Sequence, residues 1–259
     1  MVLGELDLAE RYANETVRTS HDTDLRLRAE AGSLLGNLAY EREKPKEAEE
    51  RYRKAANLYE AVRDTDAVAR QLAAVGQTLV AQGELMSAVT QLRSALDHVP
   101  NDLVLQTELA LALWLLGEGR GAVAVLTAVL EKAAGNITAL RARGEILADL
   151  GEARAAMLDL DRVTTHARPS TLAARGLALA ELDDLVGACR DIEDALAAAP
   201  RSGLVLWYAA RVFMLDGDKA EARERASQAI DATDPALSPQ HREAAGKFAS
   251  RRQAEAQLT

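Results

Sequence analysis

The chain has 259 residues, a formal net charge of −9 at pH 7, and 48% hydrophobic but only 3% aromatic residues. Its apolar content is therefore mostly aliphatic, which suits close helix–helix packing better than an aromatic-centred core. The acidic balance argues against nucleic acid as a partner, because phosphate binding needs a basic patch.

Cysteine content and hydropathy indicate the compartment. The single cysteine, Cys189, cannot form an internal disulfide and is compatible with a reducing environment. The first fifteen residues carry acids where a secretory signal has basic and then apolar residues. The longest apolar stretches, such as Leu109–Leu116, are too short to span a bilayer. We therefore expect a cytoplasmic protein with no membrane contact.

The N-terminal part predicts a helix over 2–21 and then a long repeat over 29–68. The first helix resembles one of the two helices of a preceding hairpin. In the long repeat, Tyr59 and Val62 extend the apolar face of the second helix by a turn. The segment Asp64–Asp66 is then predicted to break this second helix and to cap the next one.

A period of 34 residues follows. Gly83, Gly117 and Gly151 are spaced by 34, and small residues recur seven before and five after each glycine. Asp183 replaces the glycine once, where the period falls to 32, so we expect one loop to be two residues short. This frame predicts repeats over 69–102, 103–136, 137–168, 169–202 and 203–236.

The pattern predicts two amphipathic helices in each repeat, joined by a turn at the glycine. The small residues then mark the helix crossing, where a larger side chain would push the backbones apart. All six prolines fall at predicted helix boundaries, as they must, because proline cannot continue a helix; they are Pro45, Pro100, Pro169, Pro200, Pro235 and Pro239.

The C-terminal segment, 238–259, predicts a capping helix at about 239–257. Ser238 is the predicted N-cap and Pro239 the first helical residue. Ala244 lies 34 residues after Ala210, so we expect this helix to pack like another first helix. Its opposite face carries Arg242, Lys247, Arg251 and Arg252, as a solvated solenoid end requires.

The segment 72–100 resembles the tetratricopeptide repeat (TPR) in the spacing of its small residues, turn glycine and closing proline. Leu72 and Leu79 replace the family's first-helix Trp and Tyr. The resemblance covers about 29–236, and the long repeat resembles TPR arrays of bacterial signalling and regulatory proteins. It implies one all-α domain over 1–259. The implied fold is a right-handed superhelical solenoid of antiparallel hairpins, with about six repeats between the N-terminal and capping helices.

No residue pattern indicates an enzyme, a metal site or a cofactor. The four histidines, His21, His98, His166 and His241, share no metal-ligand spacing. Gly117–Gly121 lacks the Lys-Ser/Thr and the preceding strand of a phosphate loop. Acidic pairs such as Asp183–Asp184 and Glu193–Asp194 are expected on solvated surfaces.

Two arginines occupy a normally apolar position of the repeat. Arg143 and Arg175 each have an aspartate sixteen residues later, Asp159 and Asp191, and repeats without the arginine lack the aspartate. Ligand binding is one interpretation. We favour an Arg–Asp bridge between the two helices of one hairpin, with bidentate geometry.

The resemblance implies a binding surface on the concave side, built from the first helices. The predicted surface, called here the first-helix face, comprises residues three before and one, four and five after the small residue. Both tryptophans of the chain lie on it, either as core residues or as anchors for a partner. The candidate partner-binding residues are Asn37, Gln77, Thr107, Leu111, Trp114, Leu115, Arg141, Glu145, Trp207, Tyr208, Arg211 and Met214.

The sequence thus predicts a protein-interaction scaffold that binds a protein or peptide partner in this groove. The alternative is a homo-oligomerisation or regulatory module of a larger signalling protein, with homodimers formed through its end helices.

Overall fold

The structure is a computed structural model that describes residues 2–19, 21, 24–233 and 235–250. Within these residues it contains helices and no strand, which confirms the predicted all-α class. The helices of the N-terminal half are α1 (Val2–Thr19), α2 (Leu25–Glu41), α3 (Pro45–Ala61), α4 (Thr65–Gln82), α5 (Leu85–His98), α6 (Leu103–Leu116) and α7 (Gly119–Lys132). Those that follow are α8 (Ile137–Asp149), α9 (Ala153–Leu160), the 3-10 helix η1 (Asp161–His166), α10 (Pro169–Glu181), α11 (Leu185–Ala198), α12 (Gly203–Asp216), α13 (Lys219–Asp231) and α14 (Pro239–Ser250).

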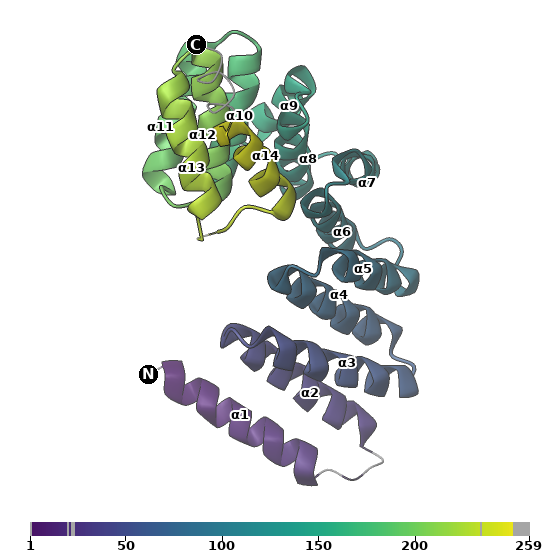
Figure 1. Ribbon diagram of the computed structural model, residues 1–259. Coiled ribbons are helices and arrows are strands. Elements are labelled where there is room, and N and C mark those ends of the chain that lie inside the picture. The colour runs from purple at the N-terminus through teal and green to yellow at the C-terminus, as the bar shows by residue number, and fades with distance from the viewer. Residues whose placement is uncertain (1, 20, 22–23, 234, 251–259) are drawn as a thin grey trace. The chain divides into compact units, whose positions relative to one another are not determined.

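The chain divides into two compact units, unit 1 (Met1–Ala112) and unit 2 (Leu113–Thr259). Successive helices pair into hairpins within each unit, α2 with α3 and α4 with α5 in unit 1, and α8 with α9, α10 with α11 and α12 with α13 in unit 2 (Figure 1). Each unit has its own buried core of mostly alanine, leucine and valine. The assignment of 1–259 to one domain stays a prediction.

The turn glycines adopt the backbone conformation that the repeat requires. Gly83, Gly117, Gly151 and Gly217 all have φ between 77° and 100°, where a side chain is strained. Asp183 takes the same left-handed conformation with φ of 68°, and aspartate tolerates it better than most residues. The hairpin turn therefore persists where the glycine is missing.

The small residues lie at helix crossings, as predicted. A Cβ on Gly76 would approach Leu92 Cγ to 2.7 Å, and one on Gly144 would approach Leu160 Cγ to 2.7 Å. Ala88 and Ala188, on the facing second helices, are fully buried. Larger side chains here would separate the two helices of the hairpin.

Helix boundaries follow the predicted signals. Pro45, Pro169 and Pro239 begin α3, α10 and α14, and no proline lies inside a described helix. The Asp64 carboxylate accepts a hydrogen bond from the Ala67 amide at 3.1 Å, so within the predicted capping segment 64–66 it is Asp64 that caps α4. The short repeat has only residues 167–168 between η1 and α10, where other repeats have four residues, such as 199–202.

Both predicted Arg–Asp bridges are present and bidentate. Arg143 donates from Nε and Nη2 to the two oxygens of Asp159 at 2.7 and 2.9 Å. Arg175 does the same with Asp191, at 2.6 Å for each bond. Both aspartates are buried while the arginines are partly exposed, and each bridge joins the two helices of its hairpin.

The expected packing of the C-terminal helix is wrong. Ala244, the predicted counterpart of Ala210, is exposed, and α14 buries His241 and Ala245 instead. The linker explains the change, because the Pro235 carbonyl accepts a hydrogen bond from the Gly203 amide at 2.9 Å and Leu237 is buried. Arg251 and Arg252 lie outside the described residues.

Candidate functional site

In unit 1, the first-helix face is open at Asn37 and Gln77. Gln77 donates to the Glu108 carboxylate at 2.8 Å, which links α4 to α6. Asn37 is exposed and accepts from the Tyr52 hydroxyl at 2.8 Å. Thr107 is buried and donates its hydroxyl to the Leu103 carbonyl of its own helix at 2.8 Å, while Leu111 is half-buried. Of these four predicted residues, only Asn37 and Gln77 present exposed polar side chains.

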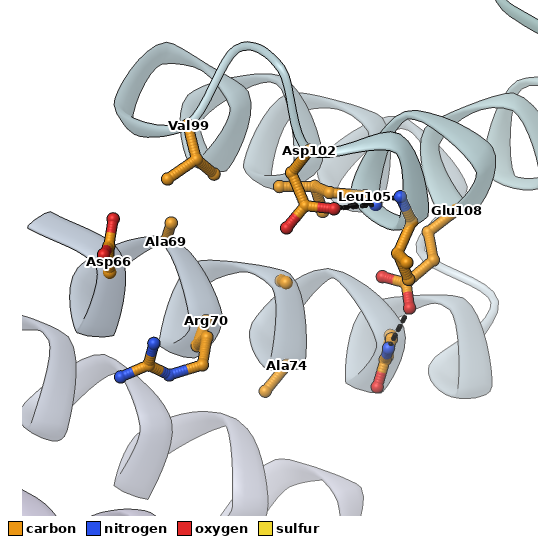
Figure 2. Close-up of a pocket in the computed structure, with 11 residues that line it drawn as sticks. Asp66, Ala69, Arg70, Ala74, Val99, Asp102, Leu105 and Glu108 are labelled. Atoms are coloured by element: carbon orange, nitrogen blue, oxygen red, sulfur yellow. Dashed lines mark hydrogen bonds between the residues drawn. The ribbon is translucent and has the colours of Figure 1, made fainter. Parts of the chain in front are cut away.

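The same face of unit 1 contains a hollow of about 600 Å³ between α4 and α6. Figure 2 shows Asp66, Ala69, Arg70 and Ala74 on one wall, and Val99, Asp102, Leu105 and Glu108 on the other. Small apolar side chains thus form much of the lining, and ionisable groups stand around them. The complete lining is Asp66, Ala69, Arg70, Ala73, Ala74, Gln77, Val99, Asp102, Val104, Leu105 and Glu108.

Carboxylates outnumber cationic groups in this hollow. The lining contains three carboxylates, those of Asp66, Asp102 and Glu108, and one guanidinium, that of Arg70. The Asp102 carboxylate caps α6 by accepting from the amides of Val104 and Leu105, and it keeps further acceptor capacity. Burial raises the pKa of Glu108, and the hydrogen bond from Gln77 opposes that rise. The hollow therefore favours a cationic group over an anionic one.

In unit 2, the predicted face residues converge on one carboxylate, Asp149 at the end of α8. Trp114 Nε1 donates to Asp149 Oδ2 at 3.1 Å, and Arg211 donates from Nη1 to Oδ1 at 3.2 Å. Arg211 also donates from Nη2 to Glu181 Oε1 at 3.2 Å, so α8, α10 and α12 are tied together. Burial acts to raise the pKa of Asp149, but the partners Trp114, Arg211 and His241 outweigh it and lower that pKa.

The aromatic residues of this face, expected either as core residues or as anchors for a partner, are buried in the structure. Trp114 and Trp207 are each only 6% exposed, and Tyr208 is fully buried. Helix α14 accounts for part of this burial, since the His241 ring meets Trp114 edge-on at 5.6 Å and Phe248 meets Trp207 at 5.5 Å. Their role as partner contacts stays a prediction, whereas their packing role is evident.

Glu145 and Arg141 are also more enclosed than an open groove would make them. Glu145 is 7% exposed and accepts from Thr171 Oγ1 at 2.6 Å and from Ser170 Oγ at 3.3 Å. Burial raises its pKa despite these bonds. Arg141 Nε and the Tyr208 hydroxyl are buried without a hydrogen-bond partner among the described residues. Leu115, Arg141, Arg211 and Met214 remain half-buried.

Sequence reasoning missed the residues that cover this face. Gln240 Nε2 donates to the Trp114 carbonyl at 2.6 Å, and His241 Nε2 lies 2.9 Å from Asp149 Oδ2. Ser238 Oγ lies 2.7 Å from His241 Nδ1 and so orients the ring. The amphipathic pattern of 239–250 indicated one buried face. The 34-residue frame, however, placed Ala244 on that face, whereas the structure buries His241 and Ala245.

The other reactive side chains of the described residues can be compared with the requirements of a metal or thiol site. No group of three or more His, Cys, Asp or Glu side chains suited to a metal ion occurs among the described residues. Cys189 is half-buried, and burial raises the pKa of its thiol, which disfavours the reactive thiolate. Within the described part of the chain, no helix has the length and hydropathy to cross a membrane. The side chain of His166 lies outside the described residues.

No protein-family model and no curated protein matches the chain, but solved structures do. A tetratricopeptide repeat protein from Parabacteroides merdae superposes with a TM-score of 0.60 at 17% identity, covering 79% of each chain. The APC/C hetero-tetramer Cut9–Hcn1 gives a TM-score of 0.69 at 14% identity, covering 96% of this chain and 46% of that chain. YrrB, described as a TPR protein with an unusual peptide-binding site, gives 0.51 at 21% identity, covering 69% of this chain and 90% of that chain. Likeness at these identities establishes the fold, and the chain therefore has the fold of the tetratricopeptide repeat proteins.

Proposed function

We propose that this chain is a protein-interaction module that binds a polypeptide segment of a partner protein on its first-helix face. One observation carries the proposal, namely the open hollow between α4 and α6 in unit 1. The description of YrrB as having a peptide-binding site makes the same use of this fold reasonable. The candidate residues form a packed and hydrogen-bonded surface with no cluster suited to catalysis, so binding is the proposed role rather than a reaction.

The lining of the hollow indicates the chemistry of the bound segment. Ala69, Ala73 and Ala74 leave room that larger side chains would fill, while Val99 and Leu105 supply apolar contact. The three carboxylates favour lysine or arginine in the segment. We therefore propose an extended segment with small or aliphatic side chains beside basic ones. In unit 2, the half-buried Leu115, Arg141, Arg211 and Met214 are the proposed accessible contacts.

The test selects peptides from a random dodecamer library on the immobilised full chain and measures their binding by fluorescence anisotropy. We expect Lys and Arg to be enriched in the selected sequences. Ala73→Trp should fill the hollow and weaken binding at least about tenfold, as loss of a central contact region commonly does. Met86→Arg is the matched control, because Met86 is exposed on α5, away from the lining.

Two outcomes would reject the proposal. One is a selection that yields no binding peptide, and the other is a folded Ala73→Trp variant that binds as tightly as the wild type. Size-exclusion chromatography with light scattering separates peptide capture from self-assembly, since a homodimer would show twice the mass without any peptide.

A further inference from the structure

Helix α14 packs along the second helix α13 and covers part of the first-helix face of unit 2 through one narrow stripe of side chains. His241 contacts Asp149 and Trp114, Ala245 is fully buried, and Phe248 contacts Trp207. Positions 241, 245 and 248 have the i, i+4, i+7 spacing of one helix face. The stripe therefore docks on the face in the way that an amphipathic helix docks in a groove.

This helix is not built like the core helices beside it. Only His241 and Ala245 are buried among the twelve residues of α14, whereas α12 buries eight of its fourteen. The outward side of α14 is charged and carries an exposed Glu243–Lys247 ion pair. Because so little of α14 is buried, its release exposes far less surface than the loss of a core helix would.

The covered face stays chemically satisfied without α14. If His241 leaves, Asp149 still accepts hydrogen bonds from Trp114 Nε1 and Arg211 Nη1, so no carboxylate is left buried without a partner. Release would uncover parts of Trp114 and Trp207, and tryptophan is the residue type most often found as an anchor in protein interfaces. The uncovered surface is thus suited to another helix.

We propose that α14 is an exchangeable intramolecular ligand of unit 2, and that the face it covers binds an amphipathic helix of a partner protein. The matching helix presents an imidazole or cationic side chain to Asp149, a small residue at the centre, and an aromatic side chain to Trp207. This inference deepens the proposed function for the first-helix face of unit 2, and its experiments are separate from the test of the hollow in unit 1.

The first experiment uses a fluorescein-labelled peptide with the sequence of residues 236–250 as the probe. The full chain carrying His241→Ala and Phe248→Ala loses the stripe of α14 but keeps Trp114, Asp149 and Trp207. We expect this variant to bind the peptide at least about tenfold more tightly than the wild-type chain, because its own α14 no longer competes. A peptide with the same two substitutions is the control and should not bind.

Hydrogen exchange of the wild-type chain provides a measurement that needs no variant. If α14 opens locally, its amides should exchange at least about a hundredfold faster than those of α12. Equal exchange in α14 and α12, or unfolding of unit 2 in the double variant, would make α14 a fixed part of the fold and overturn the proposal. A folded variant that ignores the peptide, or a wild-type dimer that the double substitution abolishes, would also overturn it.

Discussion

Units 1 and 2 use the same face of the same repeat in opposite ways. In unit 1, the first helices present alanines and a few polar side chains, and they leave a hollow between α4 and α6. In unit 2, the equivalent positions hold Trp114, Glu145, Trp207 and Arg211, and these residues contact other side chains of unit 2, including those of α14. The frame of small residues is common to both units, so the difference arises from the residues around it.

This difference shows that the repeat frame sets the position of a surface but not its use. Small residues at the crossing fix how closely two helices approach. Whether the neighbouring positions bind a partner then depends on whether their side chains can satisfy one another. Asp149 and Glu145 gather hydrogen bonds from neighbouring helices, whereas Asp66 and Arg70 in unit 1 stay exposed.

The largest effect should come from breaking either unit at its helix crossing. Ala88→Arg in unit 1 places a charge where Ala88 is fully buried, and should cost at least about 3 kcal/mol. Both tryptophans lie in unit 2. We therefore expect the Ala88→Arg variant to lose helical circular dichroism signal while its tryptophan emission stays like that of the wild type. Ala188→Arg in unit 2 should shift that emission to the red.

Met86→Arg, at an exposed position of the same helix as Ala88, serves as the control and should leave the melting curve unchanged. If Ala88→Arg also melted at the wild-type temperature with full helical signal, the assignment of the crossing residues would be wrong.

The next largest effect on stability should distinguish buried from exposed residues of the first-helix face. Trp207→Ala in unit 2 should reduce the free energy of unfolding by about 3 kcal/mol, because it removes a side chain that is only 6% exposed. Gln77→Ala in unit 1 should change it by less than about 0.5 kcal/mol. Chemical denaturation followed by circular dichroism measures both, and equal effects would contradict the contrast between the units.

The sequence predicted the parts of this contrast that depend on local geometry. The turn glycines, crossing residues, helix-starting prolines and Arg–Asp pairs all follow from backbone conformation or from the spacing within one hairpin. The full burial of Trp114 and Trp207 does not, because part of it comes from α14, whose Gln240 bonds to Trp114, 126 positions away. A 34-residue frame places Ala244 inward, whereas the structure buries His241 and Ala245, after a linker in which Pro235 bonds to Gly203 and Leu237 is buried.

The Arg–Asp bridges of unit 2 should show energetic coupling. Arg143→Leu leaves Asp159, which is 2% exposed, without its bidentate partner, and should cost about 2 kcal/mol. Adding Asp159→Val removes the unpaired carboxylate, so the double variant should be more stable than the single one. A double-mutant cycle should give a coupling of at least about 1 kcal/mol.

The same cycle on Arg175 and Asp191 is an internal replicate. A pair without coupling, Arg143 with Asp191, provides the control because these side chains belong to different hairpins. If the changes in the free energy of unfolding were strictly additive within both bridges, the bridges would have no structural role. Ligand binding would then be the better explanation for the two arginines.

The smallest expected effect concerns pH and the buried carboxylate of Glu145. Burial raises the pKa of Glu145 in the folded state above its unfolded value of about 4.3. The stability that this residue contributes is therefore fully present below the unfolded pKa and is lost as pH rises through the folded pKa. Glu145→Gln removes the titration while its amide oxygen can still accept from Thr171 and Ser170. We expect the variant to lose less stability than the wild type as pH rises from 4.5 to 8.

The neighbouring carboxylate, Asp149, titrates in the opposite direction from Glu145. The pKa of Asp149 is lowered, so its contribution is present above the unfolded value of about 3.9 and is lost only as pH falls below it. Denaturation above pH 4.5, followed by tryptophan emission, therefore reports Glu145 without interference from Asp149. Glu193→Gln, at an exposed position of unit 2, should leave the pH dependence unchanged. If Glu145→Gln and the wild type showed the same pH dependence, the Glu145 carboxylate would already be solvated, and the closed state of this face in unit 2 would be wrong.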